Sequence, residues 1–351
     1  MPDVVFAIPG DITAKTGGYI YDWHILQLLP EFGWRVRHLE LPGDYPYPSD
    51  ASLRETERLL NATPEDALLV IDGLTFGAMP EDLVARIKRR IVGLVHHPLS
   101  LEAGISEDRA AYFRKSEREA LAHTMHVLVT SPSTGELLTR DFNVPADKIT
   151  VAEPGTEPAE RARPASGPPL LLSVGSVTEH KGYGVLMKAL TQIADLGWQS
   201  RIVGSLERDL EMVKTIRAAG EWPALNGRIV LRGPLEQREL DNEYASATLF
   251  VLPSYFEGYG MAFAEAMTRG LPVVACAAGA VPKTVPPECG ILVPPGDVDA
   301  LAGALRRLLT DRQELKTRSD AAWAYAQRLP RWRDTAERFA AGLDRAMQVR
   351  A

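Results

Sequence analysis

The chain has 351 residues, of which 45% are hydrophobic and 24% charged, and a formal net charge of −7. This length is too great for one ordinary core and predicts two domains of roughly 150 residues each. The composition excludes a disordered or fibrous chain, and the absence of a long basic block argues against a nucleic-acid partner.

The first half alternates short apolar runs with longer helical patterns. The apolar runs predict strands over residues 4–8, 36–41, 67–71, 91–95 and 126–130. Residues 53–60 and 108–122 carry apolar side chains at helical spacing, and Ser106, followed by acidic residues, suits a helix start. This alternation is typical of βαβ units, so we expect an N-terminal doubly wound domain over residues 1–157.

A second alternating series follows a proline-rich stretch. Residues 157–169 contain four prolines and no apolar period, which predicts a linker over residues 158–169. The next apolar runs predict strands over residues 170–174, 200–203, 228–231, 249–252, 273–275 and 290–293. We therefore expect a second α/β domain over residues 170–329. Open α/β sheets bind ligands outside the carboxyl ends of their strands.

The most informative stretch is residues 253–267, PSYFEGYGMAFAEAM, which follows a strand and runs into a helix. Glu257 and Glu265 lie eight positions apart, and Gly258 and Gly260 place Glu257 in the loop and Glu265 in the helix. The glycines let a ligand approach the backbone, and the N–H groups at the helix start suit a negatively charged or hydroxyl-rich partner. Taken alone, a Glu after a strand is more often a cap or a surface charge.

Together these residues resemble the Glu-x7-Glu motif of retaining glycosyltransferases of the GT-B fold, family 4. Residues 269–275, RGLPVVA, resemble the passage from helix to strand after the second Glu. Residues 290–297, GILVPPGD, resemble the next strand and loop. The resemblance covers nearly all of the second domain. It implies an α/β protein with two Rossmann-like doubly wound domains facing a central cleft, and a tail, residues 330–351, that packs back on the N-terminal domain.

The resemblance also implies a nucleoside-diphosphate sugar as donor, bound by the second domain, with the acceptor on the N-terminal side. Glu265 would accept hydrogen bonds from ribose hydroxyls and Glu257 would face the donor sugar, tasks that suit a carboxylate because it accepts from two hydroxyls at once. The other donor-binding candidates of this half are Gly175, Ser176, Gly233, Gly258, Tyr259, Gly260 and Met261.

A second stretch, residues 171–182, reads as a strand, a turn and the start of a helix. Lys181 stands where the family has a phosphate-binding lysine, which would place a compact positive charge near the leaving diphosphate. Two positions depart from the family. Ser176 stands where an arginine is usual, with His180 as a conceivable substitute or a solvated histidine, and Lys283 stands where relatives often have Glu.

In the first domain, Gly18 precedes a helix and His96 follows a strand. The resemblance implies that Gly18 faces the donor phosphates and that His96, rather than His97, contacts the donor sugar. From the residues alone, a glycine such as Gly18 before a helix is more often part of an ordinary turn, and His96 could also be a buried, hydrogen-bonded histidine. Aromatic residues 19, 21 and 23 either line the acceptor side or belong to an ordinary packed helix.

The predicted function is retaining transfer of a sugar from a nucleoside-diphosphate sugar to an unidentified acceptor. Lys181 would stabilise the leaving diphosphate, and Glu257 with the carbonyl of His96 would stabilise positive charge on the sugar ring. The resemblance implies no obligatory metal and no cofactor. Two alternatives remain: nucleotide-sugar binding without turnover, and an epimerase or phosphorylase on the same architecture.

Compartment and partners follow from what the sequence lacks. No stretch approaches the roughly 18 apolar residues of a membrane span, and no signal-peptide pattern precedes residue 4, so we expect the cytoplasm. The basic residues 88–90 permit a peripheral membrane contact but favour a solvated helix face. Cys276 and Cys289 lack metal-binding spacing and are expected as buried thiols. The sequence predicts no oligomeric state.

Overall fold

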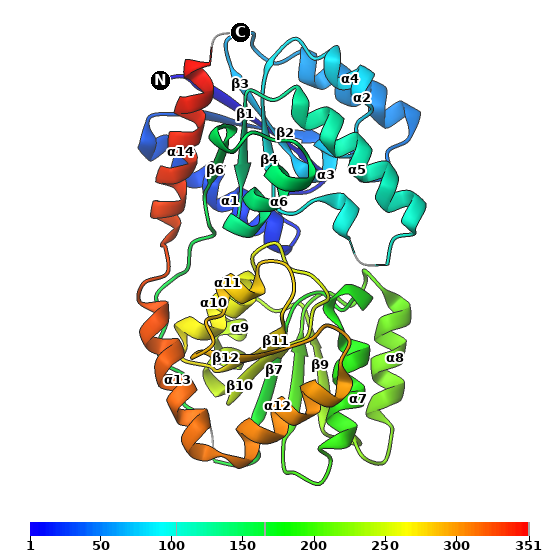
Figure 1. The fold of residues 1–351 in the computed structure, drawn as a ribbon, viewed down its shortest axis with the longest axis vertical. Coiled ribbons are helices and arrows are strands. Elements are labelled where there is room, and N and C mark those ends of the chain that lie inside the picture. The colour runs from blue at the N-terminus through cyan, green and yellow to red at the C-terminus, as the bar shows by residue number, and fades with distance from the viewer. Residues whose placement is uncertain (103, 165, 350–351) are drawn as a thin grey trace. The chain divides into compact units, whose positions relative to one another are not determined.

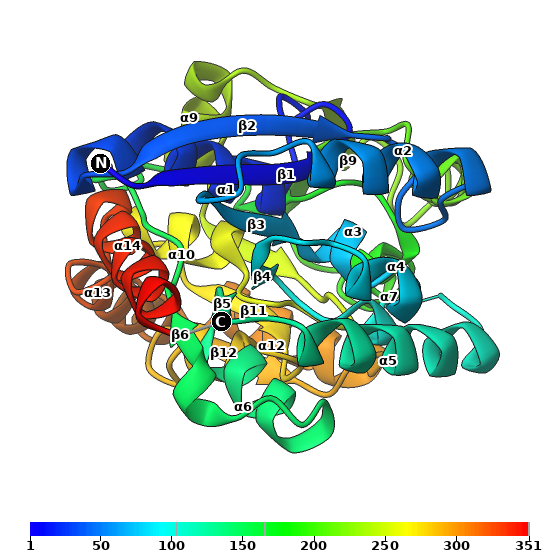
Figure 2. The ribbon, with the colours of Figure 1, turned by 90° about the horizontal axis from the view of Figure 1, so that it is seen from above.

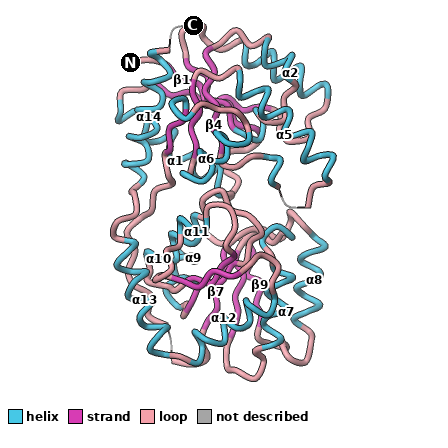
Figure 3. Tube along the Cα trace, in the orientation of Figure 1, coloured by secondary structure: helices cyan, strands magenta, loops and turns pink. Residues whose placement is uncertain are grey.

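The computed structural model describes residues 1–102, 104–164 and 166–349, and these form two compact units. Unit 1 comprises Met1–Gly155 and Pro330–Ala351, and unit 2 comprises Thr156–Leu329. Each unit is a six-stranded sheet with helices packed around it, as the strands and helices of Figure 3 show. The pairings within both sheets are parallel, which agrees with the predicted α/β class.

The sheet of unit 1 has the order β2-β1-β3-β4-β5-β6, which can be followed from the β2 edge in Figure 2. The chain therefore reverses direction across the sheet between β1 and β3. The strands are β1 (Asp3–Pro9), β2 (Arg35–Leu41), β3 (Leu68–Asp72), β4 (Arg90–Val95), β5 (His126–Val129) and β6 (Ile149–Val151). The helices are α1 (Gly17–Leu28), α2 (Asp50–Asn61), α3 (Gly73–Phe76), α4 (Glu81–Ala85), α5 (Glu107–Ala122), α6 (Pro132–Asp141) and α14 (Trp332–Gln348).

The central strands of unit 1 are apolar at every position because both faces of the sheet are covered. Val5 and Ala7 of β1 belong to a core cluster that also contains Phe113 of α5. Phe6, between them in sequence, points to the other face and stacks on Phe339 of α14 at a centroid distance of 5.5 Å. The continuous apolar run of β1 is thus the pattern of a strand buried on both sides.

Helix α14 covers one face of the unit 1 sheet, where it runs beside α1 and the strands β5 and β6 (Figure 1). A glycine makes this packing close: a Cβ at Gly342 would lie 2.6 Å from Leu128 Cδ2 and 3.2 Å from Thr150 Cβ. A second glycine, Gly155, lies where the chain passes Trp332, because a Cβ there would meet the Trp332 backbone nitrogen at 2.2 Å. Residues 330–349 therefore complete unit 1.

The sheet of unit 2 has the order β12-β11-β10-β7-β8-β9. Its strands are β7 (Leu170–Val174), β8 (Gln199–Val203), β9 (Ile229–Gly233), β10 (Leu249–Leu252), β11 (Val273–Cys276) and β12 (Gly290–Val293). Its helices are α7 (Tyr183–Gln192), α8 (Leu210–Gly220), α9 (Gln237–Ser246), α10 (Met261–Thr268), α11 (Val281–Thr284), α12 (Val298–Thr310) and α13 (Arg312–Ala326). The chain order reverses between β7 and β10, which makes the carboxyl ends of these two strands the expected ligand site of the sheet.

The proline-rich stretch belongs to unit 2 and contains no helix or strand in its described residues. It is held along that unit by backbone hydrogen bonds, from Ala162 N to Arg269 O at 2.8 Å and from Arg163 N to Ala245 O at 2.9 Å. Prolines lack the backbone N–H group that a sheet needs as a hydrogen-bond donor. The stretch therefore runs along the surface of unit 2 without joining its sheet.

Candidate active site

The two loops that leave β7 and β10 meet through their backbones. Tyr255 N, after β10, donates to His180 O, after β7, at 3.0 Å. Gly182 has φ +71°, and a Cβ there would lie 2.0 Å from Pro253 O. Only glycine fits this contact, because a side chain would collide with backbone and the φ value is unfavourable for other residues. This close approach brings two predicted site residues together.

Those residues are Lys181 and Glu257, which form an ion pair. Lys181 Nζ donates to Glu257 Oε1 at 2.7 Å, and the two side chains are 20% and 12% exposed. Lys181 ends a single 3-10 turn, η4 (Glu179–Lys181), and Glu257 lies in the loop between β10 and α10. A charge-assisted hydrogen bond at this level of burial is stronger than a surface pair because little water screens it.

Two further contacts fix the backbone of Glu257. Its carbonyl oxygen accepts from Ala280 N at 2.9 Å. A Cβ at Gly279, which has φ +57°, would lie 2.3 Å from the same oxygen. The loop after β11 therefore holds Glu257 from the other side.

The pKa of Glu257 lies below its usual value. Burial acts to raise it, but the charge and hydrogen bond of Lys181 outweigh that effect, with smaller contributions from Ser254 and His180. Glu257 is consequently ionised at neutral pH and carries the negative charge of the pair.

Glycines occupy the ends of three neighbouring strands of unit 2. Gly204 N, after β8, donates to Gly233 O at the end of β9, at 3.0 Å. A Cβ at Gly204 would lie 2.1 Å from Gly175 O, after β7. Gly175 in turn passes over the Lys181 stem, because its Cβ would lie 3.5 Å from Lys181 Cε. Gly204 thus contacts both Gly175 and Gly233. Ser176, the residue after Gly175, is half-buried.

The second motif carboxylate, Glu265, lies inside α10, as the glycine pattern predicted. Gly260, with φ +91°, caps the helix, and Met261 is its first residue. Glu265 Oε2 accepts from the hydroxyl of Tyr244 on α9 at 2.9 Å. The Tyr244 ring is covered by the Arg269 guanidinium, 4.6 Å from its centroid, and Arg269 pairs with Asp241. Gly258 and Tyr259 connect the two glutamates, and Tyr259 O accepts from Thr284 Oγ1 at 2.7 Å.

Burial raises the pKa of Glu265 above its usual value, and the Tyr244 hydrogen bond and the Arg269 charge offset only part of that effect. The two motif glutamates therefore differ: Glu257 forms an ion pair with Lys181, whereas Glu265 accepts a hydrogen bond from a phenol. In the described part of the chain, no residue forms a hydrogen bond with Glu265 Oε1. That oxygen remains available to a ligand hydroxyl.

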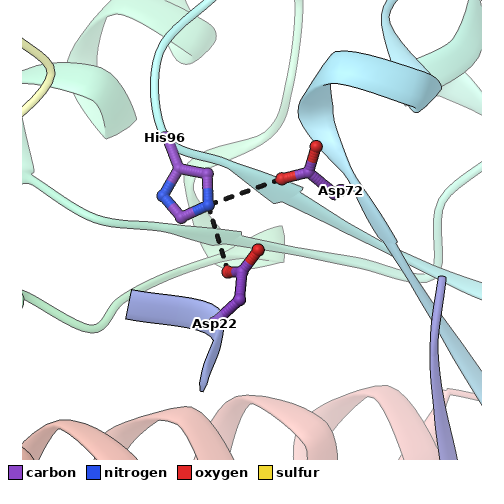
Figure 4. A group of neighbouring side chains, drawn as sticks. All are labelled: Asp22, Asp72 and His96. Carbon is purple, nitrogen blue, oxygen red and sulfur yellow. Dashed lines mark hydrogen bonds and ion pairs between the residues drawn. The ribbon is translucent and has the colours of Figure 1, made fainter. Parts of the chain in front are cut away.

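Unit 1 contains a separate cluster around His96, drawn in Figure 4. His96 Nε2 lies 3.1 Å from Asp22 Oδ1 and 3.5 Å from Asp72 Oδ2. Asp22 comes from α1 and Asp72 from the end of β3, and both are buried, whereas the His96 side chain is 20% exposed. Gly18, four residues before Asp22 on α1, lies beside the ring: a Cβ there would be in ordinary van der Waals contact with His96 Cδ2, at 3.5 Å.

The carboxylates dominate the protonation of His96. Burial alone would lower its pKa, but the charge and hydrogen bond of Asp22, followed by those of Asp72, raise it to about 10. Burial also raises the pKa of Asp22, against the opposing effect of His96. The His96 carbonyl, expected to face a sugar, accepts from Thr130 Oγ1 at 3.2 Å.

Other residues that the sequence analysis named lie in several different parts of the fold. Tyr21 is buried, donates to Ala152 O at 2.9 Å and packs against Trp332, which is the packed-helix alternative. His97 contacts Glu102 through Nε2 at 2.6 Å. Lys283 is exposed on α11. Cys276 and Cys289 are buried free thiols, as predicted.

Three residues of these clusters were missed by the sequence analysis: Asp22, Asp72 and Tyr244. Asp22 stands between the aromatic residues Tyr21 and Trp23 of α1, and Asp72 ends the apolar strand β3, so a charged residue beside large apolar side chains was a usable signal in both cases. Tyr244 gave no such signal, because a tyrosine on a helix is ordinary. Its role depends on α9 packing beside α10.

Two groups that contain acidic residues resemble cation sites in composition. Asp22, Asp72 and His96 offer ligand atoms within 4.8 Å of one another, but the raised pKa of His96 favours a protonated ring, which competes with a metal ion. Asp297 and Asp299 form an Asp-x-Asp triplet. Asp297 caps α12 by accepting from Ala300 N at 2.9 Å, and Asp299 accepts from Gln192 Nε2 at 2.7 Å. Among the described residues, no helix is both long and apolar enough to cross a membrane.

Known proteins similar to this chain are glycosyltransferases. Residues 168–311 match the family described as Glycosyl transferases group 1. The MMP alpha-(1->4)-mannosyltransferase of Mycolicibacterium hassiacum is 28% identical over 321 residues, which cover 86% of this chain and 76% of that protein. The chain spans 27% to 60% of the length of other relatives that match over shorter stretches.

Solved structures share the fold. A sucrose-phosphate synthase from Thermosynechococcus elongatus superposes with a TM-score of 0.82 at 23% identity, over 98% of this chain and 99% of that chain. HepE from Anabaena, in complex with UDP-glucose, superposes with a TM-score of 0.76 at 18% identity, over 97% and 99%. Two doubly wound parallel sheets, a matching domain and related enzymes together show that this chain is a glycosyltransferase of the GT-B fold, in the hexosyltransferase class.

Proposed function

We propose that this enzyme is a retaining transferase of family 4 type that moves a hexose from a nucleoside-diphosphate sugar to an unidentified acceptor. The proposed compartment is the cytoplasm, and no metal ion or cofactor is required. The observation that carries the proposal is the Lys181–Glu257 ion pair of 2.7 Å at the carboxyl ends of β7 and β10. Ligands of doubly wound sheets bind at such a switch point.

Lys181 provides the charge that a leaving diphosphate needs. Its ammonium group has three donors and uses one of them on Glu257. It can therefore donate to diphosphate oxygens and keep its contact with Glu257. In the transition state the bridging oxygen gains negative charge, and a cation already fixed beside it stabilises that charge without reorganisation.

The two glutamates bind different parts of the nucleotide sugar. Glu265, held by Tyr244 through Oε2, presents Oε1 to the ribose hydroxyls. Glu257 faces the donor sugar, and the backbone from Gly258 to Met261 runs between them. Gly175, Ser176, Gly233 and Gly18 are proposed to approach the donor through their backbones, and His96 to contact the sugar.

The relatives narrow the donor class. One similar protein is a mannosyltransferase, and one structure of the same fold holds UDP-glucose. Both involve a hexose, and the second carries it on a nucleoside diphosphate. Retention of the anomeric configuration is proposed from the Glu-x7-Glu motif at Glu257 and Glu265, and the missing arginine at Ser176 makes Lys181 the principal proposed cation at the diphosphate.

The test is a thermal-shift and calorimetric screen of UDP-, GDP- and ADP-hexoses, since a ligand that binds the folded state raises its melting temperature. We expect one base to be preferred, with binding weakened in Lys181→Met and Glu265→Gln. Turnover with the matching acceptor should survive EDTA, and NMR of the product should show the donor's anomeric configuration. An inverted product, or loss of activity with EDTA, would contradict the respective part of the proposal.

The remaining alternatives give different products. Transfer releases nucleoside diphosphate in proportion to the glycosylated acceptor. An epimerase would change the sugar without releasing nucleoside diphosphate, and a phosphorylase would need inorganic phosphate and a lysine-bound pyridoxal phosphate. The similarity to glycosyltransferases favours transfer over these and over binding without turnover.

A further inference from the structure

His96 is held at one ring nitrogen by two carboxylates from different elements. Nε2 lies 3.1 Å from Asp22 Oδ1 on α1 and 3.5 Å from Asp72 Oδ2 at the end of β3. While Asp22 and Asp72 are ionised they only accept hydrogen bonds, so Nε2 is the ring nitrogen that carries a proton in that state. The tautomer of His96 is thereby fixed, and Nδ1 is the nitrogen that remains for another partner.

The two carboxylates are themselves immobilised. Asp72 Oδ1 accepts from Leu74 N at 2.9 Å, which turns its other oxygen toward the ring. Asp22 is fully buried, and its Oδ2 is a buried oxygen without a hydrogen-bond partner. A buried carboxylate is costly unless a positive charge neutralises it. The imidazole ring is the titratable group in contact with both carboxylates, so a proton on Nδ1 would make the ring that positive charge.

The surroundings of the ring leave Nδ1 as a donor. The edge of Tyr21 packs against the ring, with centroids 5.3 Å apart, and Gly18 lies on the α1 side of the ring. Figure 4 shows Nδ1 on the side of the ring away from both carboxylates. In residues 1–102, 104–164 and 166–349, no hydrogen bond to Nδ1 is recorded.

From this geometry we propose that Asp22 and Asp72 hold His96 as a permanent imidazolium whose Nδ1–H donates to a sugar hydroxyl or phosphate oxygen of the nucleotide sugar. The choice of ligand rests on the proposed function. The charge state does not rest on it, because it is argued from the contacts of Asp22 and Asp72 with the ring. Asp22 and Asp72 are positioning residues, since they act through His96. The arrangement differs from a neutral histidine, which would offer a lone pair at Nδ1 and repel a phosphate oxygen.

One nearby carboxylate titrates independently and must be separated from this effect. Glu117 of α5 accepts from Leu99 N and Ser100 N at 2.5 and 3.2 Å in the loop after His96. Burial raises the pKa of Glu117 to about 7. A pH profile of activity alone would mix the two groups, so the charge of His96 is read directly by NMR.

The experiment follows the ring resonances of the seven histidines in the full chain between about pH 5.5 and 9. The His96 signal is assigned by its loss in His96→Gln. We expect no titration of His96 in this range, and a midpoint lowered by about 1 to 3 pH units in Asp22→Asn. Asp72→Asn gives a smaller shift because its oxygen is farther away, and it serves as the second variant if Asp22→Asn does not fold.

The matched control is Glu81→Gln, which removes the carboxylate of an exposed pair, His123 Nε2 to Glu81 Oε1 at 3.1 Å. It should leave the His96 signal unchanged. A wild-type His96 that titrates near pH 6.5 would overturn the proposal. So would stoichiometric binding of Mn²⁺ or Zn²⁺ that broadens or shifts the His96 signal with release of a proton, because the cluster would then be a metal centre.

The second part of the experiment adds UDP-glucose, GDP-mannose or ADP-glucose to the protein and compares each with its nucleoside diphosphate alone. A change at Nδ1 with the nucleoside diphosphate indicates a phosphate oxygen, and a change only with the sugar conjugate indicates a sugar hydroxyl. A nucleotide sugar that raises the melting temperature without moving the Nδ1 signal would overturn the proposal that Nδ1–H donates to the nucleotide sugar. If none binds, the proposed function fails, while the titration still decides the charge of His96.

Discussion

Glu257 and Glu265 share a motif, but their pKa values shift in opposite directions. Lys181 holds the pKa of Glu257 low, whereas burial raises the pKa of Glu265. The first carboxylate is therefore ionised over a wide range of pH, and the second protonates earlier during acidification than an ordinary glutamate does. Two predictions follow from this difference, one for stability and one for donor binding.

Lys181→Met should lower the free energy of unfolding at pH 7 by about 1–3 kcal/mol, because it leaves Glu257 as a buried anion without its cation. The double variant Lys181→Met, Glu257→Gln should lose less than the single variant. The low pKa of Glu257 stabilises the fold above its ordinary value, and this contribution is lost as the pH falls through the folded value. The deficit of Lys181→Met should therefore shrink on acidification in urea titrations. A constant deficit would contradict the coupling.

Tyr244→Phe removes one hydroxyl from the support of Glu265. We expect nucleotide-sugar affinity to fall about 3- to 10-fold, equivalent to about 0.7–1.4 kcal/mol, and Glu265→Gln to cost more because it removes the charge. Since the hydroxyl lowers the pKa of Glu265, the loss of affinity on acidification should begin at higher pH in Tyr244→Phe. Calorimetry across pH measures both effects, with Tyr112→Phe on α5 as control. An unchanged pH dependence would show that Tyr244 only fills space.

The sequence identified Lys181, Glu257 and Glu265 as candidates because their roles are tied to local motifs. It did not identify Tyr244, Asp22 or Asp72, because these side chains reach their partners through contacts between elements far apart in the chain. Asp22 and His96 are separated by 74 positions, and no spacing rule covers such a pair.

At the scale of elements, the site depends on how tightly the loops after β7 and β10 meet. Gly182 and Gly184 stand two residues apart and have contrasting surroundings. A Cβ at Gly182 would meet Pro253 O at 2.0 Å, whereas a Cβ at Gly184 would meet nothing within 4 Å.

Gly182→Ala should therefore separate the two loops and lower both stability and donor affinity. The cost of the backbone conformation alone is about 1–2 kcal/mol, and the collision adds to it. Gly184→Ala in helix α7 should be neutral or stabilise by up to about 1 kcal/mol, since alanine favours a helix. Melting temperatures and nucleotide-sugar titrations of both variants measure the difference. Equal behaviour of the two would contradict the described contact.

Most strands could be predicted because each is a short apolar run between turn residues. Strand β6 (Ile149–Val151) was missed, since three residues are too few for a periodic signal and its place in the sheet comes from pairing with β5. The short helices α3 and α11 were missed for the same reason. Helix termini such as Ser106, which accepts from Arg109 N at 3.3 Å, were readable because capping is local.

At the scale of the whole molecule, unit 1 is assembled from both ends of the chain. Residues 330–349 supply α14, and Phe339 packs on Phe6 of β1. The residues proposed to bind the nucleotide belong to unit 2, apart from Gly18 and His96.

A chain ended after Leu329 should lose the ordered fold of unit 1 and keep that of unit 2. We expect rapid amide hydrogen exchange in β5 and β6, continued protection of β7 and β10, and nucleoside-diphosphate binding within about 10-fold of the full chain. A full-length chain carrying Met347→Ala, an exposed change on α14, is the control. Loss of protection throughout unit 2 would contradict its independence, and loss of nucleotide binding with unit 2 intact would contradict the proposed donor residues.

The position of α14 also bears on how the protein is made. During synthesis on the ribosome, residues 156–329 emerge before the helix that closes the first sheet. The buried core of unit 2 consists of residues between Leu171 and Ala326, so unit 2 can fold before α14 has been synthesised. Until then, Phe6 and Leu128 of unit 1 lack the helix that covers them. The nascent N-terminal sheet is thus the segment that a chaperone would bind, and its release should follow the emergence of α14 from the ribosome.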